Sequence, residues 1–567
     1  MGQYRQYLPP GQPSFHLDYP EHATAGDLLA GSARRFGDRV ALRDGEETLT
    51  YAELYDAARR VAGGLTDLGI GPGATVALDQ PNSLWFTVSY YGVLLAGAVV
   101  TPVNPGLPAG LVHDQLVEAG AVAAIAHPAT LGVLAEAAVP GLRHTVVVPP
   151  SHAAPGEVPA GFTGSRLETL LAAEPAPRPA TGPADVAQLC FTGGTTGRSK
   201  AVEITHRNVV ANSVQTAAYR TGSVPRVDDD GGVYLEAVPA ARTPWTPEPG
   251  TTRSVALAPF FHAMGLIGQN VAVLSGTDVT VFGRFDPVRF LDTLERLRVD
   301  QMQGSPALFH ALLAVPGVEQ RDLTSVRWVG TGAAPIETDT LARLARVFPN
   351  AIVVEGYGLT EATMALAVHP LAGPGVVPPG SVGAPLFDTE LSIRSLTDGS
   401  ELGPGEVGEI WARGPQIAGG YRNQPELTAE QFPGDGWLRT GDLGRLDDEG
   451  FLHLSGRAKD MLIYKGYNVY PAALEEVLVQ HRGVAQAAVI GVPRDGVGEV
   501  PVAFVVPAAS TDGTPGLAEE IVEHVAARVA PYARVREVRF VEALPTSAAG
   551  KVLKTELRAS FAGTAAG

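Results

Sequence analysis

Short apolar runs rich in β-branched residues alternate with stretches of helical periodicity along most of the chain. The run VTVFG at 279–283 is followed by the helical stretch VRFLDTLERLRV, and this by the strand-like run VRWVG from Val326. Thr50 and Glu53 form a capping box ahead of another periodic helix, which we expect to end near Gly69. Strands and helices that alternate in this way are typical of α/β layers. The pattern therefore predicts an α/β fold.

The order of the elements changes toward the C-terminus. A helix from Pro471, the strand-like runs AAVIGVP and PVAFVVP, a helix over 517–529 and the run VREVRFVEALP follow one another. This αββαβ order predicts a compact α+β domain. We therefore expect a large α/β domain of several subdomains at 1–456, a hinge at 457–461 and a small mobile cap domain at 462–567.

One segment is apolar enough to resemble a membrane span. No Asp, Glu, Lys or Arg occurs from Gln80 to His113. A span needs about 20 mostly apolar residues in one helix. Gly92 and Gly97 interrupt the segment, and 99–103 has the pattern of a strand. We therefore predict a buried helix followed by a core strand, and no membrane span.

Two stretches rich in Pro, Ala and Gly, 149–184 and 221–253, interrupt the periodic pattern. Segments of such length without secondary structure are usually either functional lids or disordered. We expect both to be surface loops. The second carries the run Asp228-Asp229-Asp230, and we expect it to be a mobile insertion.

Composition limits the size, the partners and the compartment. A chain of 567 residues exceeds the roughly 250–300 that one core supports, so more than one domain is expected. The 42 Lys and Arg against 60 Asp and Glu give a net charge of −18, which argues against a nucleic-acid or anionic-membrane surface. Cys190 is the single cysteine, which excludes an intramolecular disulfide, and the start lacks an apolar signal core. These features predict a cytoplasmic protein that binds any polyanion locally.

The most informative motif is the run FTGGTTGRSK at 191–200, which follows an apolar strand-like run. Glycines let the backbone approach a ligand closely, and threonine hydroxyls can donate to phosphate oxygens or bind Mg²⁺. Lys200 closes the run with a positive charge. The spacing differs from the phosphate loop of the P-loop NTPases, since Lys200 precedes Ala201 and not Ser or Thr. We predict a loop that wraps phosphates.

Four further motifs supply nucleotide-binding chemistry. The run EGYGLTEAT at 355–363 offers Tyr357 for stacking on a base and Glu361 as an oxygen ligand for Mg²⁺. Asp442 stands in the tight turn of WLRTGDLG, where one carboxylate can accept both hydroxyls of a ribose. The runs GRAKDMLIYKGYNVYP and PTSAAGK carry the cations Arg457, Lys459, Lys465 and Lys551.

These five motifs, in this order and spacing, resemble the adenylate-forming (AMP-binding) superfamily of acyl-CoA synthetases, peptide-synthetase adenylation domains and luciferases. The resemblance covers nearly the whole chain, and TGGTTGxxK, GYGLTE, TGD, GRxKD and PxxxxGK occur together. The runs LTYAEL, PVNP, EGYGLTEA, KGYNVYP and LPxSxxGK are most similar to those of medium- and long-chain fatty acyl-CoA synthetases.

The resemblance implies a role for each matching residue. Contacts to the ATP phosphates are expected from Thr192, Gly193, Gly194, Thr195, Thr196, Gly197 and Lys200. Adenine, ribose and the acyl-adenylate are expected against Ala333, Ala334, Gly356, Tyr357, Thr360, Asp442 and Arg457. The implied catalytic residues are Lys551, His262 at the acyl pocket, and Thr195 and Glu361 as holders of Mg²⁺. CoA is expected at Lys465 and Gly466, and the hinge at Lys459.

The resemblance implies the activity of an acid–thiol ligase. ATP would convert a carboxylic acid, expected to be a fatty acid, into an acyl-adenylate with release of pyrophosphate. CoA would then take the acyl group, and AMP would leave. Lys551 and Mg²⁺ would stabilise charge that develops on the α-phosphate. A cap that pivots at Lys459 would then remove Lys551 and present Lys465.

Three alternatives stay open from the sequence. The thiol acceptor can be the phosphopantetheine of a carrier protein, and the acid can be an aryl or cinnamate-type acid. A retired member of the family would only bind a nucleotide or a partner, but every catalytic position is occupied. A carrier protein or a second copy of the chain are further candidate partners, whereas nucleic acid is not expected. The stretch 221–253 is a candidate cover for the acyl entrance.

Overall fold

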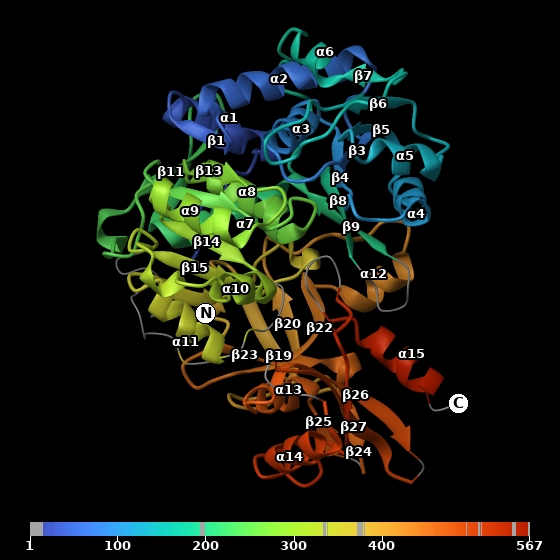
Figure 1. The fold of residues 1–567 in the computed structure, drawn as a ribbon. Coiled ribbons are helices and arrows are strands. Elements are labelled where there is room, and N and C mark those ends of the chain that lie inside the picture. Colours follow the sequence, from blue (N-terminus) through green and yellow to red (C-terminus); the bar gives the residue numbers. More distant parts are fainter. Residues whose placement is uncertain are drawn as a thin grey trace.

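The computed structural model describes residues 15–192, 199–332, 336, 338–370, 378, 380–465, 467–494, 496–508, 511, 513–546 and 552–564. Some predicted site residues lie outside these ranges: Gly193, Gly194, Thr195, Thr196, Gly197, Ala333, Ala334, Gly466 and Lys551. Figure 1 shows the N-terminal half of the chain at the top and the small C-terminal unit at the bottom.

The first of two large sheets has seven strands in the order β16-β15-β14-β12-β13-β1-β2. Its neighbours run parallel, except for the antiparallel pair β1–β2. In chain order the strands are β1 (Val40–Asp44), β2 (Glu47–Thr50), β12 (Arg253–Ala256), β13 (Asp278–Val281), β14 (Gln301–Gly304), β15 (Trp328–Thr331) and β16 (Ile352–Glu355).

The second large sheet has eight strands in the order β21-β9-β8-β4-β3-β5-β6-β7. It is parallel from β8 to β7, and the pairs β8–β9 and β9–β21 are antiparallel. Its strands are β3 (Thr75–Asp79), β4 (Val99–Pro102), β5 (Ala121–Ala126), β6 (His144–Val147), β7 (Ser165–Arg166), β8 (Val186–Thr192), β9 (Lys200–Thr205) and β21 (Gly420–Tyr421).

Helices cover and separate these two sheets. They are α1 (Ala25–Phe36), α2 (Tyr51–Asp67), α3 (Leu84–Leu95), α4 (Ala109–Ala119), α5 (Leu131–Ala137), α6 (Leu167–Leu171), α7 (His206–Thr221), α8 (Ala263–Leu274), α9 (Pro287–Leu297), α10 (Pro306–Leu313), α11 (Thr338–Val347) and α12 (Pro425–Gln431). The predicted capping box is present, because the Thr50 side chain accepts from the Glu53 amide at the start of α2. Helices α7 and α8 pack against each other, and most of their residues are buried.

The apolar segment at 80–113 folds as predicted. Helix α3 is buried along nearly its whole length and contacts strands of both large sheets, and β4 follows it. The hydroxyl of Tyr91 donates to Asn270 Oδ1 on α8 at 2.7 Å, and Asn270 Nδ2 donates to the Tyr90 hydroxyl at 3.0 Å. This pairing of polar atoms is that of a core helix. Within the described ranges, no helix combines the length and apolarity that a bilayer span needs.

An antiparallel four-stranded sheet leads into the C-terminal unit, and Figure 1 shows it between that unit and the large sheets. Its strands are β19 (Glu390–Arg394), β20 (Gly408–Arg413), β22 (Trp437–Leu446) and β23 (Leu452–Arg457). The remaining short elements are β10 (Ser223–Val227), β11 (Val233–Ala237), β17 (Ala367–Val368), β18 (Ala384–Pro385) and the 3-10 helices η2 (Pro239–Ala241), η3 (Val318–Gln320), η4 (Thr360–Ala362) and η5 (Ala458–Asp460).

The C-terminal unit is a mixed sheet with helices packed against it. Its elements are β24 (Leu462–Tyr464), β25 (Tyr467–Val469), α13 (Pro471–Val479), β26 (Val484–Arg494), β27 (Gly498–Pro507), α14 (Pro515–Ala526), β28 (Glu537–Phe540) and α15 (Lys554–Thr564). The order α13-β26-β27-α14-β28 is the predicted αββαβ order. A large N-terminal α/β domain and a small C-terminal α+β domain are therefore confirmed.

The prediction of a surface loop over 221–253 is wrong for its first half, 223–237. Strands β10 and β11 form an antiparallel hairpin in this stretch. Its turn is held by Asp228, which accepts from Arg34 Nε of α1 at 2.7 Å. The hairpin also lies directly on α1, where a Cβ at Gly31 would come within 2.0 Å of the Val233 carbonyl oxygen. The acidic run is a turn rather than a mobile insertion because its charge is paired by a helix almost 200 residues earlier.

The loop predicted for 149–184 is interrupted by β7 and α6. Helix α6 buries Leu167 and Leu170. Its backbone packs onto α2, where a Cβ at Gly64 would meet Leu170 Cα at 2.7 Å. The helix is short, and it depends on this contact rather than on its own periodicity.

Candidate functional site

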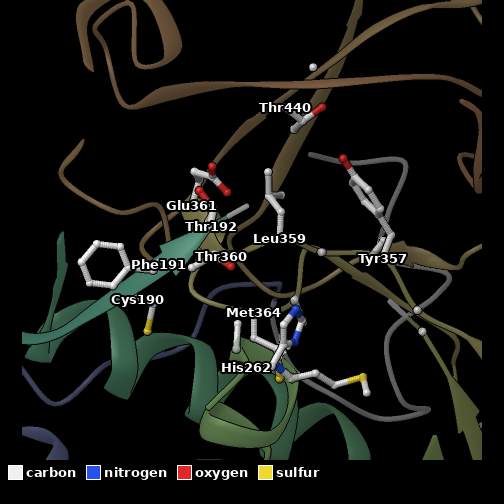
Figure 2. Close-up of a pocket in the computed structure, with 18 of the residues that line it drawn as sticks. Cys190, Phe191, Thr192, His262, Tyr357, Leu359, Thr360, Glu361, Met364 and Thr440 are labelled. Atoms are coloured by element: carbon white, nitrogen blue, oxygen red, sulfur yellow. Dashed lines mark hydrogen bonds between the residues drawn. The ribbon is translucent and has the colours of Figure 1, made fainter. Parts of the chain in front are cut away.

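A cavity of about 1000 Å³ lies where the seven-stranded sheet, the β8–β9 hairpin and the segment before the C-terminal unit meet. Figure 2 shows side chains from separate elements around this space. The predicted site residues that line it are Thr192, Lys200, His262, Gly356, Tyr357, Thr360, Glu361, Arg457 and Lys459. The structure therefore brings together motifs that lie far apart in the sequence, from Thr192 to Lys459.

The predicted phosphate loop connects the two strands of an antiparallel hairpin. Thr192 at the end of β8 pairs with Lys200 at the start of β9. Lys200 Nζ lies 5.3 Å from the centroid of the Tyr421 ring, and the Tyr421 hydroxyl donates to Glu361 Oε1 at 2.8 Å. Burial, and next the charge of Glu361, raise the pKa of Tyr421, so the phenol stays a donor. One aromatic side chain thus links a cation and a carboxylate beside the loop.

The backbone around Glu361 is tightly constrained. Thr363 has a φ of 67°, which a β-branched residue rarely adopts, and its hydroxyl donates to the Gln416 carbonyl at 2.7 Å. Gly358 lies so close to the next turn that a Cβ would come within 1.7 Å of the Met364 carbonyl oxygen. Strained backbone of this kind concentrates at functional sites. The turn fixes the Glu361 carboxylate at the cavity wall.

A buried carboxylate connects the turn after β16 to the C-terminal strands. Asp442 pairs across the ladder with Arg457, and its Oδ1 accepts from Arg457 Nε at 2.9 Å. Its Oδ2 accepts from the Tyr357 hydroxyl at 2.8 Å. Burial, and next the Asp442 charge, raise the pKa of Tyr357, which keeps the phenol protonated. Asp442 is buried and does not itself line the cavity, whereas its neighbours Thr440 and Gly441 and its partners Tyr357 and Arg457 do.

The predicted hinge lies at the cavity. Burial, and next the positive charge of Arg457, lower the pKa of Lys459 in η5. The neighbouring Asp460 accepts from Arg558 of α15 at 2.9 Å. Leu553, just before α15, also lines the cavity. The segment after β23 therefore contacts both the cavity and the last helix.

His262 caps the N-terminus of α8. Its Nδ1 accepts from the Met264 amide at 3.4 Å, and Figure 2 shows its ring directed into the pocket. The loop before it is held by Asn82, which donates to the Ala258 carbonyl at 3.0 Å and accepts from the Phe260 amide at 2.7 Å. The position of His262 is thus set by its own cap and by a second segment of the chain.

The structure adds two residues that the sequence did not predict. Arg220 near the end of α7 and Trp328 at the start of β15 both line the cavity, and Arg220 Cζ lies 4.0 Å from the centroid of a Trp328 ring. Arg220 is the first charged residue after Arg207, in a helix that is otherwise buried. That signal was ambiguous, because a cation in the last turn of a helix also suits the helix dipole.

Lys465 is not brought to the cavity. It lies exposed between β24 and β25 with a φ of 49°, and its Nζ is 5.6 Å from the centroid of the Tyr464 ring. Its amide donates to the Val497 carbonyl at 2.8 Å. In this arrangement the small domain directs Leu553, and not Lys465, toward the cavity.

Comparison with known proteins covers both domains. The chain matches the family described as AMP-binding enzyme over residues 29–422, and the family described as AMP-binding enzyme C-terminal domain over 473–551. It is 33% identical to a 4-coumarate-CoA ligase of Narcissus pseudonarcissus, over 96% of this chain and 94% of the relative.

Two further matches also extend over nearly the full length. A Mycobacterium tuberculosis CoA ligase for a methyl-dioxo-octahydro-indenyl-propanoyl group is 36% identical, over 93% of this chain and 96% of the relative. The crystal structure of the anthranilate CoA ligase AuaEII in complex with anthranoyl-AMP superposes with a TM-score of 0.84 at 25% identity. That match covers 97% of this chain and 99% of the other.

Proposed function

The chain belongs to the AMP-binding enzyme family, and we propose that its acid substrate is an aryl or cinnamate-type acid. The protein is an AMP-forming acid–thiol ligase: ATP activates a carboxylic acid, and CoA takes the acyl group. ATP and CoA are its co-substrates. We also propose the cytoplasm as its compartment, because Cys190 is the single cysteine and is a buried free thiol.

Two groups of lining residues support separate parts of the nucleotide site. Thr192 and Lys200 pair with each other at the ends of β8 and β9, and both line the cavity. This position supports the proposal that residues 193–197, which lie between them in the sequence, wrap the phosphates. Tyr357 offers an aromatic face in the same cavity for adenine. Ala333, Ala334, Gly356 and Thr360 are the further residues that we propose around adenine and the adenylate.

We propose that Asp442 and Arg457 serve the ribose. Each Asp442 oxygen already accepts one hydrogen bond, from Tyr357 or from Arg457, and a carboxylate oxygen can accept a second. The carboxylate therefore both orients Tyr357 and keeps capacity for hydroxyl donors. Arg457 also places a cation in the cavity for the phosphates.

The remaining roles concern movement and transfer. We propose a hinge at 457–461 centred on Lys459, Lys551 as the lysine of adenylate formation, and Lys465 with Gly466 at CoA. The exposed position of Lys465, away from the cavity, supports a domain rotation between two half-reactions. His262 would lie beside the reacting carboxylate.

We call the part of the cavity at Arg220 and Trp328 its acid end, because we propose that the acid substrate binds there. The side chains at this end favour an aryl acid over a fatty acid. Trp328 presents a large aromatic surface there, and Arg220 lies against it. A long alkyl chain would bury its methylenes against an unpaired guanidinium, which is unfavourable. A flat ring can pack on such surfaces, and the relatives named above include ligases for 4-coumarate and anthranilate.

A substrate panel tests this proposal. We expect aryl and cinnamic acids to exceed linear C6 to C16 acids by about tenfold or more in kcat/KM, measured as AMP release with CoA present. A higher kcat/KM for a linear acid would contradict the proposal and indicate a fatty acid as the substrate. Mass spectrometry of the products separates the acceptors: a CoA thioester supports free CoA, whereas adenylate without thioester supports a carrier protein.

The residues present fit Mg²⁺ as the metal. Mg²⁺ usually binds one or two carboxylates together with substrate phosphates. Glu361 offers such a carboxylate at the cavity, and we propose Thr195 as its partner. In the described part of the chain no cluster of three His, Cys, Asp or Glu holds a metal, which fits an ion completed by ATP. When bound, Mg²⁺ would neutralise phosphate charge.

Glu361→Gln tests this metal site. We expect the Mg²⁺ concentration for half-maximal pyrophosphate exchange to rise by about 10- to 100-fold, because the amide loses the charge that binds the ion. Glu426→Gln on α12 is the matched control, since Glu426 is exposed and does not line the cavity. An unchanged Mg²⁺ requirement in Glu361→Gln would remove Glu361 from the metal site.

A further inference from the structure

The end of the cavity at Trp328 holds a guanidinium, that of Arg220, which has no polar partner among the described residues. Arg220 makes no hydrogen bond and no ion pair with any residue that the structure describes. Its guanidinium instead makes a cation–π contact with the Trp328 ring. Burial lowers the pKa of Arg220 to about 10, and no acidic neighbour opposes this shift. The group therefore remains charged near neutral pH. A half-buried charge with no polar partner among the described residues is costly, so its retention calls for an explanation.

A second, smaller cavity of about 100 Å³ adjoins the first at this point. The two cavities share six lining residues: Thr216, Arg220, Met264, Gln303, Trp328 and Met364. None of the phosphate-side residues, such as Thr192, Lys200 or Arg457, lines the smaller cavity. Arg220 thus stands where a ligand would reach the recess, at the end away from the phosphate loop.

Two neutral polar side chains beside Arg220 also make no hydrogen bond within the part of the chain that the structure describes. Thr216 lies one helical turn before Arg220, so both side chains project from the same face of α7. Its Oγ1 is buried and makes no hydrogen bond among the described residues. The Gln303 side chain on β14 likewise makes none there. Buried polar atoms are normally paired, so the buried Thr216 hydroxyl, with the half-buried Arg220 and Gln303 at the same space, indicates a polar ligand group.

The Trp328 indole, on which Arg220 stacks, fits against the strand only because residue 330 is a glycine. Trp328 and Gly330 alternate on β15 and therefore share one face of the strand. A Cβ at Gly330 would come within 2.2 Å of the Trp328 ring, so only glycine leaves room for the indole there. A guanidinium stacked on an aromatic face keeps its edge N–H groups available for a planar, bidentate acceptor. A carboxylate has that geometry.

We propose that Arg220 is a specificity-determining residue that binds a second carboxylate, at the end of the substrate distal to the carboxyl group that ATP activates. Thr216 and Gln303 would supply additional hydrogen bonds to the same group. The substrate class is then an aryl dicarboxylic acid, of which one carboxylate reacts and the other stays unchanged. This inference rests on the proposed function, because it requires this cavity to bind the acid.

Three acids of one shape test the inference: cinnamic acid, 4-methylcinnamic acid and 4-carboxycinnamic acid. With the wild-type enzyme we expect kcat/KM for pyrophosphate release to be about 30-fold or more higher for 4-carboxycinnamic acid than for the methyl compound. In Arg220→Gln the ratio of the two values should fall to about one or below. Arg220→Lys should give an intermediate ratio, because it keeps the charge and loses the bidentate fork.

Arg226→Gln is the matched control, since Arg226 is exposed on β10 and pairs with Glu236 at 2.7 Å. Its ratio should equal that of the wild type. Equal kcat/KM for the carboxy and methyl acids in the wild type would overturn the role of Arg220 and leave the aryl ligase function standing. Absence of turnover with all three acids would overturn both. The wild-type comparison decides the matter even if Arg220→Gln folds poorly.

Discussion

Lys551→Ala should lower acid-dependent pyrophosphate exchange by about 10²- to 10³-fold. The lysine would stabilise negative charge that develops on the α-phosphate as the acid attacks, and the loss of one such preorganised contact costs about 3–4 kcal/mol. Transfer from a preformed acyl-adenylate to CoA should be little affected, because the proposed domain rotation removes Lys551 before that step. Exchange and transfer, measured separately on the same variant, distinguish a catalytic role from misfolding.

Lys554→Ala is the control for this variant. Lys554 lies three residues later, at the start of α15, where its Nζ pairs with Glu475 Oε1 at 2.7 Å. Removal of that pair should affect the melting temperature and not the exchange rate. Normal exchange in Lys551→Ala, or an equal loss in Lys554→Ala, would withdraw the assignment of Lys551.

Asp442→Asn should reduce kcat/KM for ATP by roughly 30- to 150-fold, which corresponds to about 2–3 kcal/mol. One carboxylate oxygen of Asp442 accepts from Tyr357 and the other accepts from Arg457. The asparagine amide has a single oxygen and no negative charge, so it cannot replace both acceptors. Tyr357 would lose its orientation, and Arg457 would lose its counter-charge. We expect the effect mainly in KM for ATP, with little change in KM for the acid.

Asp448→Asn is the matched control in the same β-hairpin. Asp448 is exposed in the turn between β22 and β23, away from the cavity. The same substitution there should leave kcat/KM for ATP unchanged. Tyr357→Phe removes one donor but keeps the charge, so a smaller loss is expected than in Asp442→Asn. Equal KM values for ATP in Asp442→Asn and wild type would show that the carboxylate has no part in nucleotide binding.

The local motifs made much of the site predictable. A glycine- and threonine-rich run that ends in Lys200 has few structural uses other than a loop at a ligand, and the structure finds its ends at the cavity. The capping box at Thr50 and the apolar segment of α3 were predictable in the same way, because the signal lies within a few neighbouring residues. The roles of Thr195, Gly466 and Lys551 stay predictions.

Long-range packing explains the predictions that failed. The stretch 221–253 has no strong period, and its acidic turn becomes ordered only through Arg34 on α1. The same holds for α6, whose few residues are stabilised by α2. Composition alone indicated loops in both places, because the partners lie about a hundred residues or more away in the sequence.

The sequence by itself determined the domain order, the α/β class and the chemistry of the nucleotide motifs, because each depends on residues that are close together in the chain. Only the tertiary structure decided the acid end of the cavity. Arg220 and Trp328 come from a helix and a strand far apart in sequence, and neither belongs to a local motif. Their contact joins the last turn of α7 to the start of β15 and arises only in the folded chain, so no pattern along the chain could reveal it.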